Sequence, residues 1–580
     1  MVAPTASRVV AVTLALLALG AARDAASARA QQTPRAEILW DTYGIPHIRA
    51  TDDAALFFAF GWAQARNHGN LLLRLLGVSR ARAAEYWGED ELGSDRLLWT
   101  LRIPDAAERA YASYDPTFRS YIDAFAAGIN AYADAHPDRI AQEVRRVLPI
   151  RGVDILAHAG VIGLGFSRAP SVVEQWARQA ATSPGQESAL AAEAAAAPGA
   201  GSNAWAIAPA KSASGRALLL ANPHLPWGGI MTWMEAQLTS PSIDIYGATL
   251  VGMPVIAIGF NDRLGWTHTV NTQDTEDFYE LQMSGPSSYA FAGAERELAV
   301  DTVLIGVRRA GAVEREPLVR LRSVHGPVLG VADGRALAAR RLEDVGEARL
   351  SDAFPQWWDM GRARDRRAFE QALRRHAIVG QNITYADAAG DIAYYYGAAT
   401  PVRPGGDAAF WAWFLPGDSA ALVWTEVHPF DDMPRVVNPP AGWVQNANDP
   451  PWLATYPRAL DRDAFPAYFA PDILPLRPQR SIRMLRQAGT LSLEGLIARK
   501  HSTYMELADR VLPELVAAAR AHGGPAARRA AAVLIGWDRT ANPQSRGGVL
   551  FQAWALAAFR RTGNQPFATR WSAAAPLTTP

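Results

Sequence analysis

The stretch "APGAGSNAWAIAPAKSASG" (197–215) joins two segments of different composition, and Ser202 stands at the junction. Upstream, residues 176–201 are rich in Ala and Glu and close on Pro and Gly, a composition typical of linkers. Downstream, the sequence reads as a strand. A loop serine is usually a turn residue or a helix cap. The alternative hypothesis is that Ser202 becomes the first residue of a new chain and acts as a nucleophile.

An N-terminal serine carries a general base of its own. Its free α-amine titrates near pH ~7.7–8.0, so it can accept a proton at neutral pH without a histidine, directly or through a water. Exposing that amine requires cleavage of the peptide bond before the serine. Gly201 gives this bond backbone freedom, and the linker gives it slack. We therefore predict cleavage between Gly201 and Ser202.

The common hydrolase signatures do not offer a rival nucleophile. The sequence has no G-x-S-x-G and no H-E-x-x-H, and neither Lys211 nor Lys500 has a serine three residues before it. Because the chain has no Cys, a thiolate metal site is excluded as well. A conventional triad assembled from distant residues stays open, although no motif favours it.

Composition sets broad limits on function. The chain has 580 residues, of which 49% are hydrophobic, enough for a large core spread over several domains. Its 57 basic and 57 acidic residues balance, which argues against a nucleic-acid binder. Without Cys, the chain would gain no disulfides in an oxidising compartment.

Residues 1–30 are predicted to be a signal peptide. Arg8 precedes the apolar run "VVAVTLALLALGAA" (9–22), and "ARA" (28–30) fits a cleavage site before Gln31. The run is shorter than the ~20 residues of a membrane span, and no other segment resembles one. We expect export to the periplasm. The alternative is a disordered or amphipathic N-terminus.

Periodicity along the chain predicts an α+β fold. "AEILWDTYGIPHIRA" (36–50) alternates like a hairpin around Tyr43–Gly44, and helical spacing follows to about residue 180. After Ser202, β-branched and aromatic runs alternate with turns, including a hairpin that turns at Ala389–Gly390. Beyond about residue 480 the pattern is helical again. A strand-rich centre between helical parts indicates a layered α+β architecture.

Four stretches together resemble the penicillin acylase family of N-terminal-nucleophile hydrolases. They are "YGIPHIRATDDAALFFAFGWAQA" (43–65), "SNAWAIAPAKSASGRALLLANPHLPW" (202–227), "GMPVIAIGFNDRLGWTHTVNTQDTEDFYEL" (252–281) and "QNITYADAAGDIAYYYGAATPVR" (381–403). The resemblance covers about residues 36–580 and implies a precursor that cuts itself. Residues 31–175 would form the first chain, 176–201 an excised spacer and 202–580 the second chain. The two chains would form one αββα sandwich, a heterodimer from one precursor.

The resemblance also implies roles for individual residues. Ser202 is the nucleophile, and the backbone at His224 helps to fix it and the oxyanion. The backbone N–H of Val270 and the side chain of Asn382 point at the oxyanion, and Arg403 orients Asn382 and the amine. From the residues alone, the alternatives are a packed strand-end histidine at His224, which is compatible with the role, and a surface ion pair at Arg403.

A structural calcium site is implied in the same way, and no catalytic cofactor is expected. "DTED" (274–277) matches ligands of the family through Asp274, Asp277 and the backbone of Glu276. Hard oxygen ligands separated by turns suit Ca²⁺. Glu174 is the candidate carboxylate from the first chain. The alternative is a solvated acidic turn.

The resemblance places Phe166, Leu225, Ile256 and Ala257 in a pocket for the acyl group. Gly165 stands where phenylacetyl-preferring members have Arg, and His224 and Leu225 are more similar to the acyl-homoserine-lactone and aculeacin acylase branches. We expect a small N-acyl amide as substrate, either an N-acyl-homoserine lactone or a β-lactam side chain. Apolar pocket differences discriminate substrates by only ~1–3 kcal/mol, so the choice stays open.

Two rival functions also stay open. One is an acylase of the same mechanism that acts on lipopeptides or other N-acyl amino acids. The other is an inactive protein on this scaffold that binds acyl amides. Family members continue past a segment like "PFATRWSAAAPLTTP" (566–580), so the C-terminal part of the fold is expected to be missing from this sequence.

Overall fold

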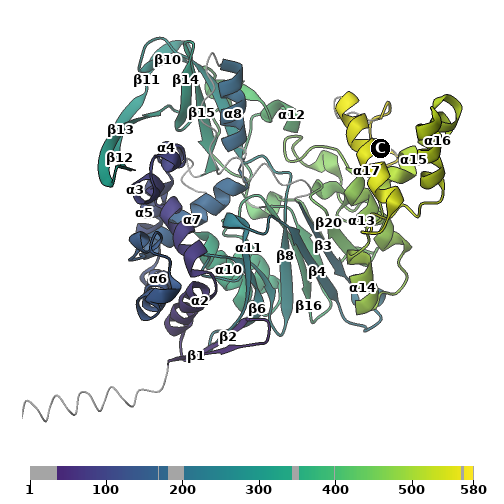
Figure 1. Cartoon of the computed structure of the whole chain (residues 1–580), viewed down its shortest axis with the longest axis horizontal. Coiled ribbons are helices and arrows are strands. Elements are labelled where there is room, and N and C mark those ends of the chain that lie inside the picture. Colours follow the sequence, from purple (N-terminus) through teal and green to yellow (C-terminus); the bar gives the residue numbers. More distant parts are fainter. Residues whose placement is uncertain are drawn as a thin grey trace, which may run out of the picture.

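The structure is a computed structural model that describes residues 35–167, 169–180, 201–342, 352–397, 399–562 and 567–578. Strands form the centre of the molecule, and helices lie on both sides of them (Figure 1). In chain order, a hairpin and a helical part come first, a strand-rich part follows, and helices close the chain. This is the α+β organisation that the sequence predicts.

The largest sheet combines strands from both sides of Ser202, in the order β1-β2-β5-β6-β7-β8-β16-β17-β19. β1 and β2 are the predicted antiparallel hairpin, and β2 pairs in parallel with β5, where Ile48 lies opposite Leu238. The strands are β1 Ala36–Trp40, β2 Pro46–Ala50, β5 Trp233–Ser240, β6 Ile243–Leu250, β7 Ile258–Phe260, β8 Leu264–Val270, β16 Gln381–Asp387, β17 Ile392–Tyr395 and β19 Arg435–Val437. The predicted turn at Ala389–Gly390 is confirmed, because it joins β16 to β17.

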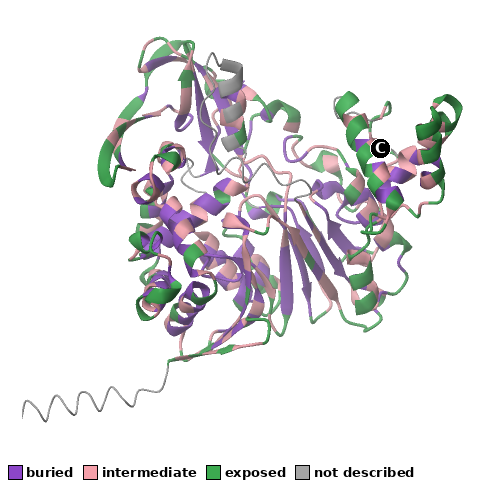
Figure 2. Ribbon diagram, viewed as in Figure 1, coloured by how far each residue is buried: buried purple, intermediate pink, exposed green. Residues whose placement is uncertain are grey.

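A second sheet of three strands packs against the first. Its order is β20-β3-β4, with β3 Gly201–Ile207, β4 Leu218–His224 and β20 Trp443–Asn446. Side chains of a strand alternate between its faces. Ala206 belongs to the core between the sheets with Tyr394, whereas Trp205 packs on the other side with Ile482. Most residues of β3, β8, β16, β17 and β20 are buried (Figure 2). Ser202 lies on the face of Ala206, toward the larger sheet.

Helices cover the two outer faces, so the layers are αββα. Phe57 and Trp358 meet over the larger sheet with ring centroids 5.0 Å apart, and Phe369 lies against Trp266 of β8. Helix α13 covers the smaller sheet. The N-terminal helices are α2 Asp53–Ser79, α3 Ala83–Trp87, α4 Leu92–Thr100, α5 Ile103–Ser113, α6 Pro116–Ala135, α7 Gly152–Gly165 and α8 Ala169–Ala180. The later helices are α10 Ala353–Arg362, α11 Arg366–Leu373, α12 Ala408–Trp411, α13 Leu476–Gln487, α14 Leu493–Lys500, α15 Glu506–His522, α16 Pro525–Ile535 and α17 Arg546–Arg561.

Smaller β structures extend one end of the molecule (Figure 1). A four-stranded sheet has the order β14-β15-β9-β18, and two hairpins, β10–β11 and β12–β13, lie beside it. The strands are β9 Glu276–Gln282, β10 Ser288–Phe291, β11 Ala294–Glu297, β12 Ala299–Arg309, β13 Ala312–Arg322, β14 Val328–Ala332, β15 Arg335–Arg341 and β18 Phe414–Pro416. In the part of the chain that is described, no helix has the length and apolar composition needed to cross a membrane.

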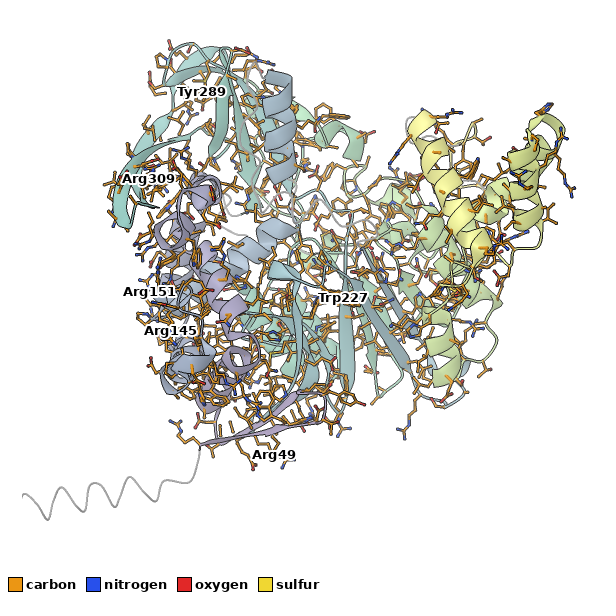
Figure 3. The ribbon with its side chains drawn as sticks, viewed as in Figure 1. Arg49, Arg145, Arg151, Trp227, Tyr289 and Arg309 are labelled. Carbon is orange, nitrogen blue, oxygen red and sulfur yellow. The ribbon has the colours of Figure 1, made fainter. Side chains whose placement is uncertain are left out.

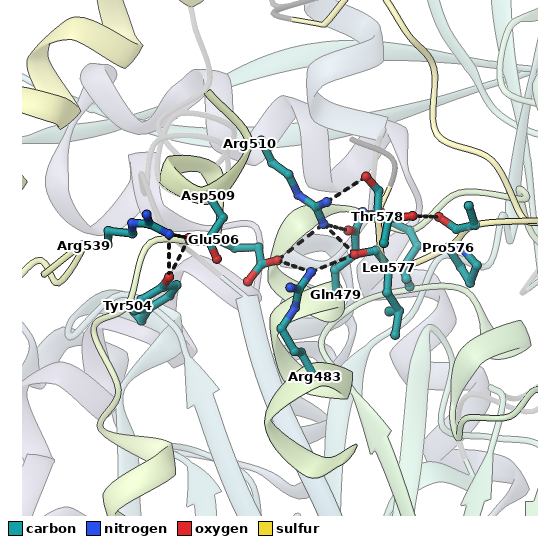
Figure 4. A network of polar contacts seen from close by, with 12 residues as sticks. Gln479, Arg483, Tyr504, Glu506, Asp509, Arg510, Arg539, Pro576, Leu577 and Thr578 are labelled. Atoms are coloured by element: carbon teal, nitrogen blue, oxygen red, sulfur yellow. Dashed lines mark hydrogen bonds and ion pairs between the residues drawn. The ribbon is translucent and has the colours of Figure 1, made fainter. Parts of the chain in front are cut away.

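The last described residues fold back on α13 and α15 (Figure 4). Arg483 donates a hydrogen bond of 2.7 Å to the carbonyl of Leu577, and Arg510 donates to the carbonyls of Leu577 and Thr578. Glu506 is buried between the two arginines, 2.8 Å from Arg483. Charged side chains therefore fasten this segment to the helices.

The linker begins later than its composition predicts. Helix α8 runs to Ala180, and Trp176 within it is buried against Gly330, where a Cβ would meet the indole ring at 2.9 Å. A buried tryptophan is part of a core, so the first residue of the predicted spacer packs with the folded part of the chain. The predicted signal peptide and the rest of the predicted spacer lie outside the described residues.

Candidate active site

Ser202 is the second residue of β3 and has a strand partner on one side only. Pro223 of β4 lies opposite it, whereas the pairing with β20 ends two residues further on, at Ala204 and Asn446. Ser202 is 3% exposed. The side without a strand is therefore left for side chains from other parts of the molecule.

Ser202 contributes to the wall of a cavity of about 610 Å³. Helices α5 and α7 form one side of it through residues such as Ala107 and Leu156, and strands β5, β6 and β8 contribute to the other. Trp357 of α10 closes a further part of the wall. The size and the mainly apolar lining are typical of small-molecule sites.

Three of the four residues predicted for the acyl pocket line this cavity: Phe166, Leu225 and Ala257. Phe166 follows α7 directly, and Leu225 follows β4. Ile256 is not in the lining, because its Cγ2 packs on the other side against Gly247 and Gly259. Ile256 is thus beside the cavity wall and not part of its described lining, and its place in an acyl pocket stays a prediction.

Val270 and Asn382 lie on neighbouring strands, β8 and β16. Of these two described residues, Val270 lines the cavity and Asn382 does not. Asn382 is fully buried, and its Nδ2 donates to Thr269 Oγ1 at 3.0 Å and to Asn446 Oδ1 at 3.1 Å. Its Oδ1 accepts a hydrogen bond of 2.7 Å from the hydroxyl of Tyr394. Both amide protons are thus engaged, and one of these hydrogen bonds must be exchanged before Asn382 can donate to an oxyanion. That role stays a prediction.

Neither histidine near Ser202 is placed to act as its base. His224 pairs with Gly201, so its imidazole lies on the opposite face of the small sheet, 3.4 Å from Asn203 Nδ2. His268 lines the cavity, but its Nε2 accepts a hydrogen bond of 2.9 Å from Trp357. Burial lowers the pKa of His268 to about 4, so it is neutral at neutral pH. The backbone role predicted for His224 remains compatible with its place beside Gly201.

Arg403 is bound to two aspartates and not to Asn382. Its side chain is 0% exposed, and its Nη2 donates to Asp277 Oδ1 at 2.8 Å and to the carbonyl of Asp274 at 3.1 Å. Asn382 is oriented by Thr269, Asn446 and Tyr394 instead. The predicted orientation of Asn382 by Arg403 is therefore corrected. A buried guanidinium requires a paired carboxylate, and Asp277 provides it.

Two of the predicted calcium ligands, Asp274 and Asp277, form ion pairs with Arg403. Asp277 also accepts from the indole N–H of Trp424 at 2.6 Å, and Glu276 accepts from Ser167 at 2.8 Å. Among the residues that the structure describes, no group of three or more potential ligand side chains could hold a metal. In this arrangement Arg403 supplies a positive charge to Asp274 and Asp277. The side chain of Glu174 on α8 lies outside the described residues, and calcium at this site stays a prediction.

Two residues that the sequence did not single out contact Ser202 directly. Asn448 accepts a hydrogen bond of 2.6 Å from the backbone nitrogen of Ser202 through Oδ1 and donates one of 2.7 Å to the carbonyl of Val270 through Nδ2. Arg477 donates to the carbonyl of Ser202 at 2.7 Å and to Asn203 Oδ1 at 2.8 Å. They lie 246 and 275 residues from Ser202, so no local pattern could reveal them.

An exposed tryptophan lies close in sequence to the cavity wall. Trp227 follows Leu225 by two residues and is completely exposed, near the middle of Figure 3. A large apolar side chain in this position is available for contact with a ligand.

Comparisons with known proteins agree on one family. The family model described as penicillin amidase matches residues 35–578. The acyl-homoserine lactone acylase PvdQ of Pseudomonas syringae pv. syringae (strain B728a) is 28% identical, over 94% of this chain and 75% of its own. Aculeacin-A acylase of Actinoplanes utahensis is 26% identical, over 93% and 76%. Penicillin acylase 2 proenzyme of Pseudomonas sp. (strain SE83) is 26% identical, over 75% and 61%.

The fold is also that of a solved structure. The thermostable penicillin G acylase from Alcaligenes faecalis in orthorhombic form superposes with a TM-score of 0.53 at 23% identity, over 63% of this chain and 65% of that one. The chain therefore spans about three quarters of the PvdQ and aculeacin-A acylase sequences and slightly less than two thirds of the penicillin G acylase chain.

Proposed function

The chain belongs to the penicillin amidase family, whose members hydrolyse amide bonds, and from this premise we propose an acylase that uses Ser202 as its N-terminal nucleophile. The observation that carries the proposal is the position of Ser202 on the wall of an apolar cavity of about 610 Å³. The nucleophile thus adjoins a space suited to an acyl chain. Neither His224 nor His268 is placed to act as general base, which leaves the α-amine of Ser202 for that role.

The proposed maturation is a self-cleavage at Gly201–Ser202. The Ser202 hydroxyl attacks the carbonyl carbon of Gly201, the C–N bond breaks, and the acyl group moves to the serine oxygen while the nitrogen becomes an amine. Water then hydrolyses the ester, leaving the carboxyl end of the first chain and a free Ser202. A side chain on residue 201 would oppose this arrangement, because a Cβ there would lie 2.9 Å from both Arg477 and Asn448.

In the proposed catalytic cycle, the α-amine of Ser202 takes the hydroxyl proton as the oxygen attacks the substrate amide. The backbone N–H of Val270 and the amide of Asn382 stabilise the oxyanion, and one such donor is typically worth ~10²–10³ in rate. The leaving amine receives the proton, and water then releases the acid from the acyl-serine. No metal or cofactor takes part in these steps.

We propose N-acyl-homoserine lactones or β-lactam side chains as substrates, with medium or long acyl chains favoured over phenylacetyl. The names of two relatives, an acyl-homoserine lactone acylase and a penicillin acylase, and the apolar lining support this class. Lipopeptides and other N-acyl amino acids are the alternative. Gly163 of α7 offers a direct test, because it lines the cavity and a Cβ there would meet nothing within 4 Å.

We expect Gly163→Phe to shorten the preferred acyl chain, because the ring enters open space in the cavity. The measurement is kcat/KM over a series of acyl-homoserine lactones, penicillin G and aculeacin A. Gly93→Phe on α4 is the matched control, since it too has open space around its Cβ but does not line the cavity. A preference unchanged by Gly163→Phe, or phenylacetyl substrates turned over best, would contradict the proposed pocket.

The test of the nucleophile compares wild type with Ser202→Ala. We expect intact mass and N-terminal sequencing to show two chains in wild type, the second beginning at Ser202, and one uncut, inactive chain in the variant. Ser214→Ala, in an exposed loop, is the control and should be cut and active. Full activity in an uncut wild type, or in Ser202→Ala, would end the proposal.

We also propose export with removal of residues 1–30, supported by the apolar run and the "ARA" site. Cell fractionation and N-terminal sequencing should find the first chain in the periplasm, beginning at Gln31. A first chain that begins at Met1 in the cytoplasm would refute it.

A further inference from the structure

The connection between β6 and β7, residues 251–257, carries part of the cavity wall. Met253 and Ala257 within it line the cavity, as do Leu250 before it and Ile258 after it. The β6–β7 connection contains no helix or strand, so its shape depends on hydrogen bonds that other elements make to its backbone. The side chains that donate to its carbonyls are those of Gln64, His158 and Trp266.

Gln64 binds the β6–β7 connection at two consecutive residues. It lies on α2, within the stretch 43–65 by which the sequence resembles the family, and it is 0% exposed. Its Oε1 accepts a hydrogen bond of 2.8 Å from the backbone nitrogen of Gly252, and its Nε2 donates one of 2.8 Å to the carbonyl of Met253. A flipped amide would lose both hydrogen bonds, so the orientation of Gln64 is fixed.

His158 of α7 binds the residue before these two. Its Nε2 donates a hydrogen bond of 2.9 Å to the carbonyl of Val251. The ring is fully buried, and burial lowers its pKa to about 4, so it is neutral at neutral pH. A neutral imidazole that donates through Nε2 accepts through Nδ1, and the hydroxyl of Ser79 at the end of α2 lies 3.0 Å from Nδ1. Val251 and Ser79 therefore set one tautomer of His158.

Gly252 allows the imidazole to come this close to the backbone. Its φ is +98°, and a Cβ on it would lie 2.4 Å from Cδ2 and 2.5 Å from Nε2 of His158. The ring therefore lies directly against the β6–β7 connection. Any side chain at residue 252 would push His158 away from the carbonyl of Val251.

His158 joins two parts of the cavity wall. Its neighbours on α7, Leu156, Ala159 and Gly160, line the cavity, whereas His158 itself does not. Helix α7 packs beside α2, which carries Gln64 (Figure 1). The hydrogen bond from His158 thus fixes the spacing between the helical part of the wall and the β6–β7 connection by a polar contact outside the cavity.

From this geometry we propose that His158 and Gln64 are positioning residues for the acyl group: they hold the β6–β7 connection against α7 and α2 and thereby set the shape of the cavity. The inference rests on the proposed function, because the cavity is an acyl pocket only if Ser202 is the nucleophile. A rigid apolar wall discriminates between substrates that differ by one methylene at ~10–200-fold. A wall that moves loses part of this discrimination, because it adjusts to acyl chains of different length.

His325 offers a matched control. It is also fully buried with a pKa that burial lowers to about 4, and its Nε2 donates a hydrogen bond of 2.8 Å to a backbone carbonyl, that of Gly417. Neither His325 nor Gly417 lines the cavity. His158→Leu and His325→Leu therefore remove the same kind of hydrogen bond from equally buried sites, and only the first change affects the cavity wall.

The experiment measures kcat and KM for acyl-homoserine lactones of increasing chain length. In His158→Leu we expect the ratio of kcat/KM for the best substrate to that for a chain two carbons shorter to fall about 10-fold, mainly through KM. His158→Gln should restore most of this ratio, because its amide can donate to the carbonyl of Val251. His325→Leu should keep the ratio of wild type at a comparable loss of melting temperature.

A second readout does not depend on turnover. In the uncut Ser202→Ala background, backbone hydrogen exchange of peptides that cover residues 251–257 should be faster in His158→Leu than in His325→Leu. Gln64→Met, which keeps the length of the side chain and loses both hydrogen bonds, should accelerate this exchange and lower the chain-length ratio in the same way. If His158→Leu does not fold, Gln64→Met decides the comparison.

A chain-length ratio equal to that of wild type in His158→Leu and Gln64→Met would overturn the inference and leave the proposed function intact. An equal fall of the ratio in His325→Leu would overturn it as well, because the effect would then follow from lost stability alone. Failure of the proposed function is seen in wild type itself, which would cleave none of these amides. That result does not depend on His158 or Gln64.

Discussion

Thr269, Asn382 and Asn446 form a closed group of buried side chains below the candidate site. Thr269 Oγ1 donates to Asn446 Oδ1 at 2.6 Å and accepts from Asn382 Nδ2. Two residues away on β8, Thr267 is equally buried, but its hydroxyl has no partner in the described structure. The two threonines therefore form a natural pair for comparison.

We expect Thr269→Val to lower the free energy of unfolding by about 1–3 kcal/mol, because it leaves buried polar atoms of both asparagines short of a partner. Thr267→Val removes a hydroxyl that has no partner and should be neutral or stabilising. Urea denaturation of both variants in the Ser202→Ala background, which is expected to remain one chain, gives the comparison. Equal losses in the two variants would contradict the role assigned to Thr269.

For single residues, the sequence was informative where a residue lies within or next to a recognisable motif. The change of composition drew attention to Ser202, and the family resemblance named Phe166, Leu225 and Ala257; all four line one cavity, and their roles stay predictions. Arg403 was assigned the wrong partners, because a sequence does not show which carboxylate a buried guanidinium meets.

At the scale of single elements, the start of α3 depends on a carboxylate from the next helix. Asp95 is buried and accepts hydrogen bonds from the backbone nitrogens of Ala83 and Ala84 at 2.9 and 2.8 Å. Burial raises its pKa to about 7. The folded state therefore binds a proton more tightly than the unfolded state, in which the pKa is near the ordinary value of 3.8.

We expect this group to stabilise the protein as pH falls from about 7 toward 4, by at most about 1.4 kcal/mol per pH unit. Asp95→Asn cannot take up the proton, so the stability advantage of wild type over the variant should grow as pH falls. Urea denaturation of both proteins at pH 5 and pH 8 measures this difference. An advantage that is larger at pH 8 would show that Asp95 is charged in the folded protein.

The elements themselves were largely predictable from periodicity. The hairpin at 36–50, the helical part up to about residue 180 and the β16–β17 turn all follow from local patterns. The predicted spacer, which starts at residue 176, overlaps the last turns of α8, because Ala-rich composition does not reveal that Trp176 packs on Gly330, more than 150 residues away in the sequence. The parallel pairing of β2 with β5 joins strands far apart in the sequence, so no local pattern could predict it.

At the scale of the whole molecule, the parts before and after Ser202 are built into one core. β2 pairs with β5, and the largest hydrophobic cluster contains both Phe57 from the first part and Trp358 from the second. A cut at Gly201–Ser202 removes none of these contacts. The two predicted chains should therefore stay together without a covalent link.

We expect the cut protein to elute as one species in native size-exclusion chromatography and to give two bands only after denaturation. The uncut Ser202→Ala chain should elute at the same volume. Separation of wild type into two species under native conditions would contradict the shared core.

The parallel pairing of β2 with β5 also bears on what happens after unfolding. In the uncut chain, the hairpin that contains β2 reaches its place in the sheet by a first-order step, since a covalent connection limits how far it can diffuse. Once that connection is lost, the same strand must return from solution, and reassembly becomes second order in protein. After dilution out of urea, the recovery of folded cut protein should then be greater at high than at low protein concentration. At low concentration the mature enzyme would persist through a slow rate of unfolding and not through a reversible equilibrium. The precursor would thus be the form that folds efficiently, and the mature protein would retain that fold because it unfolds slowly.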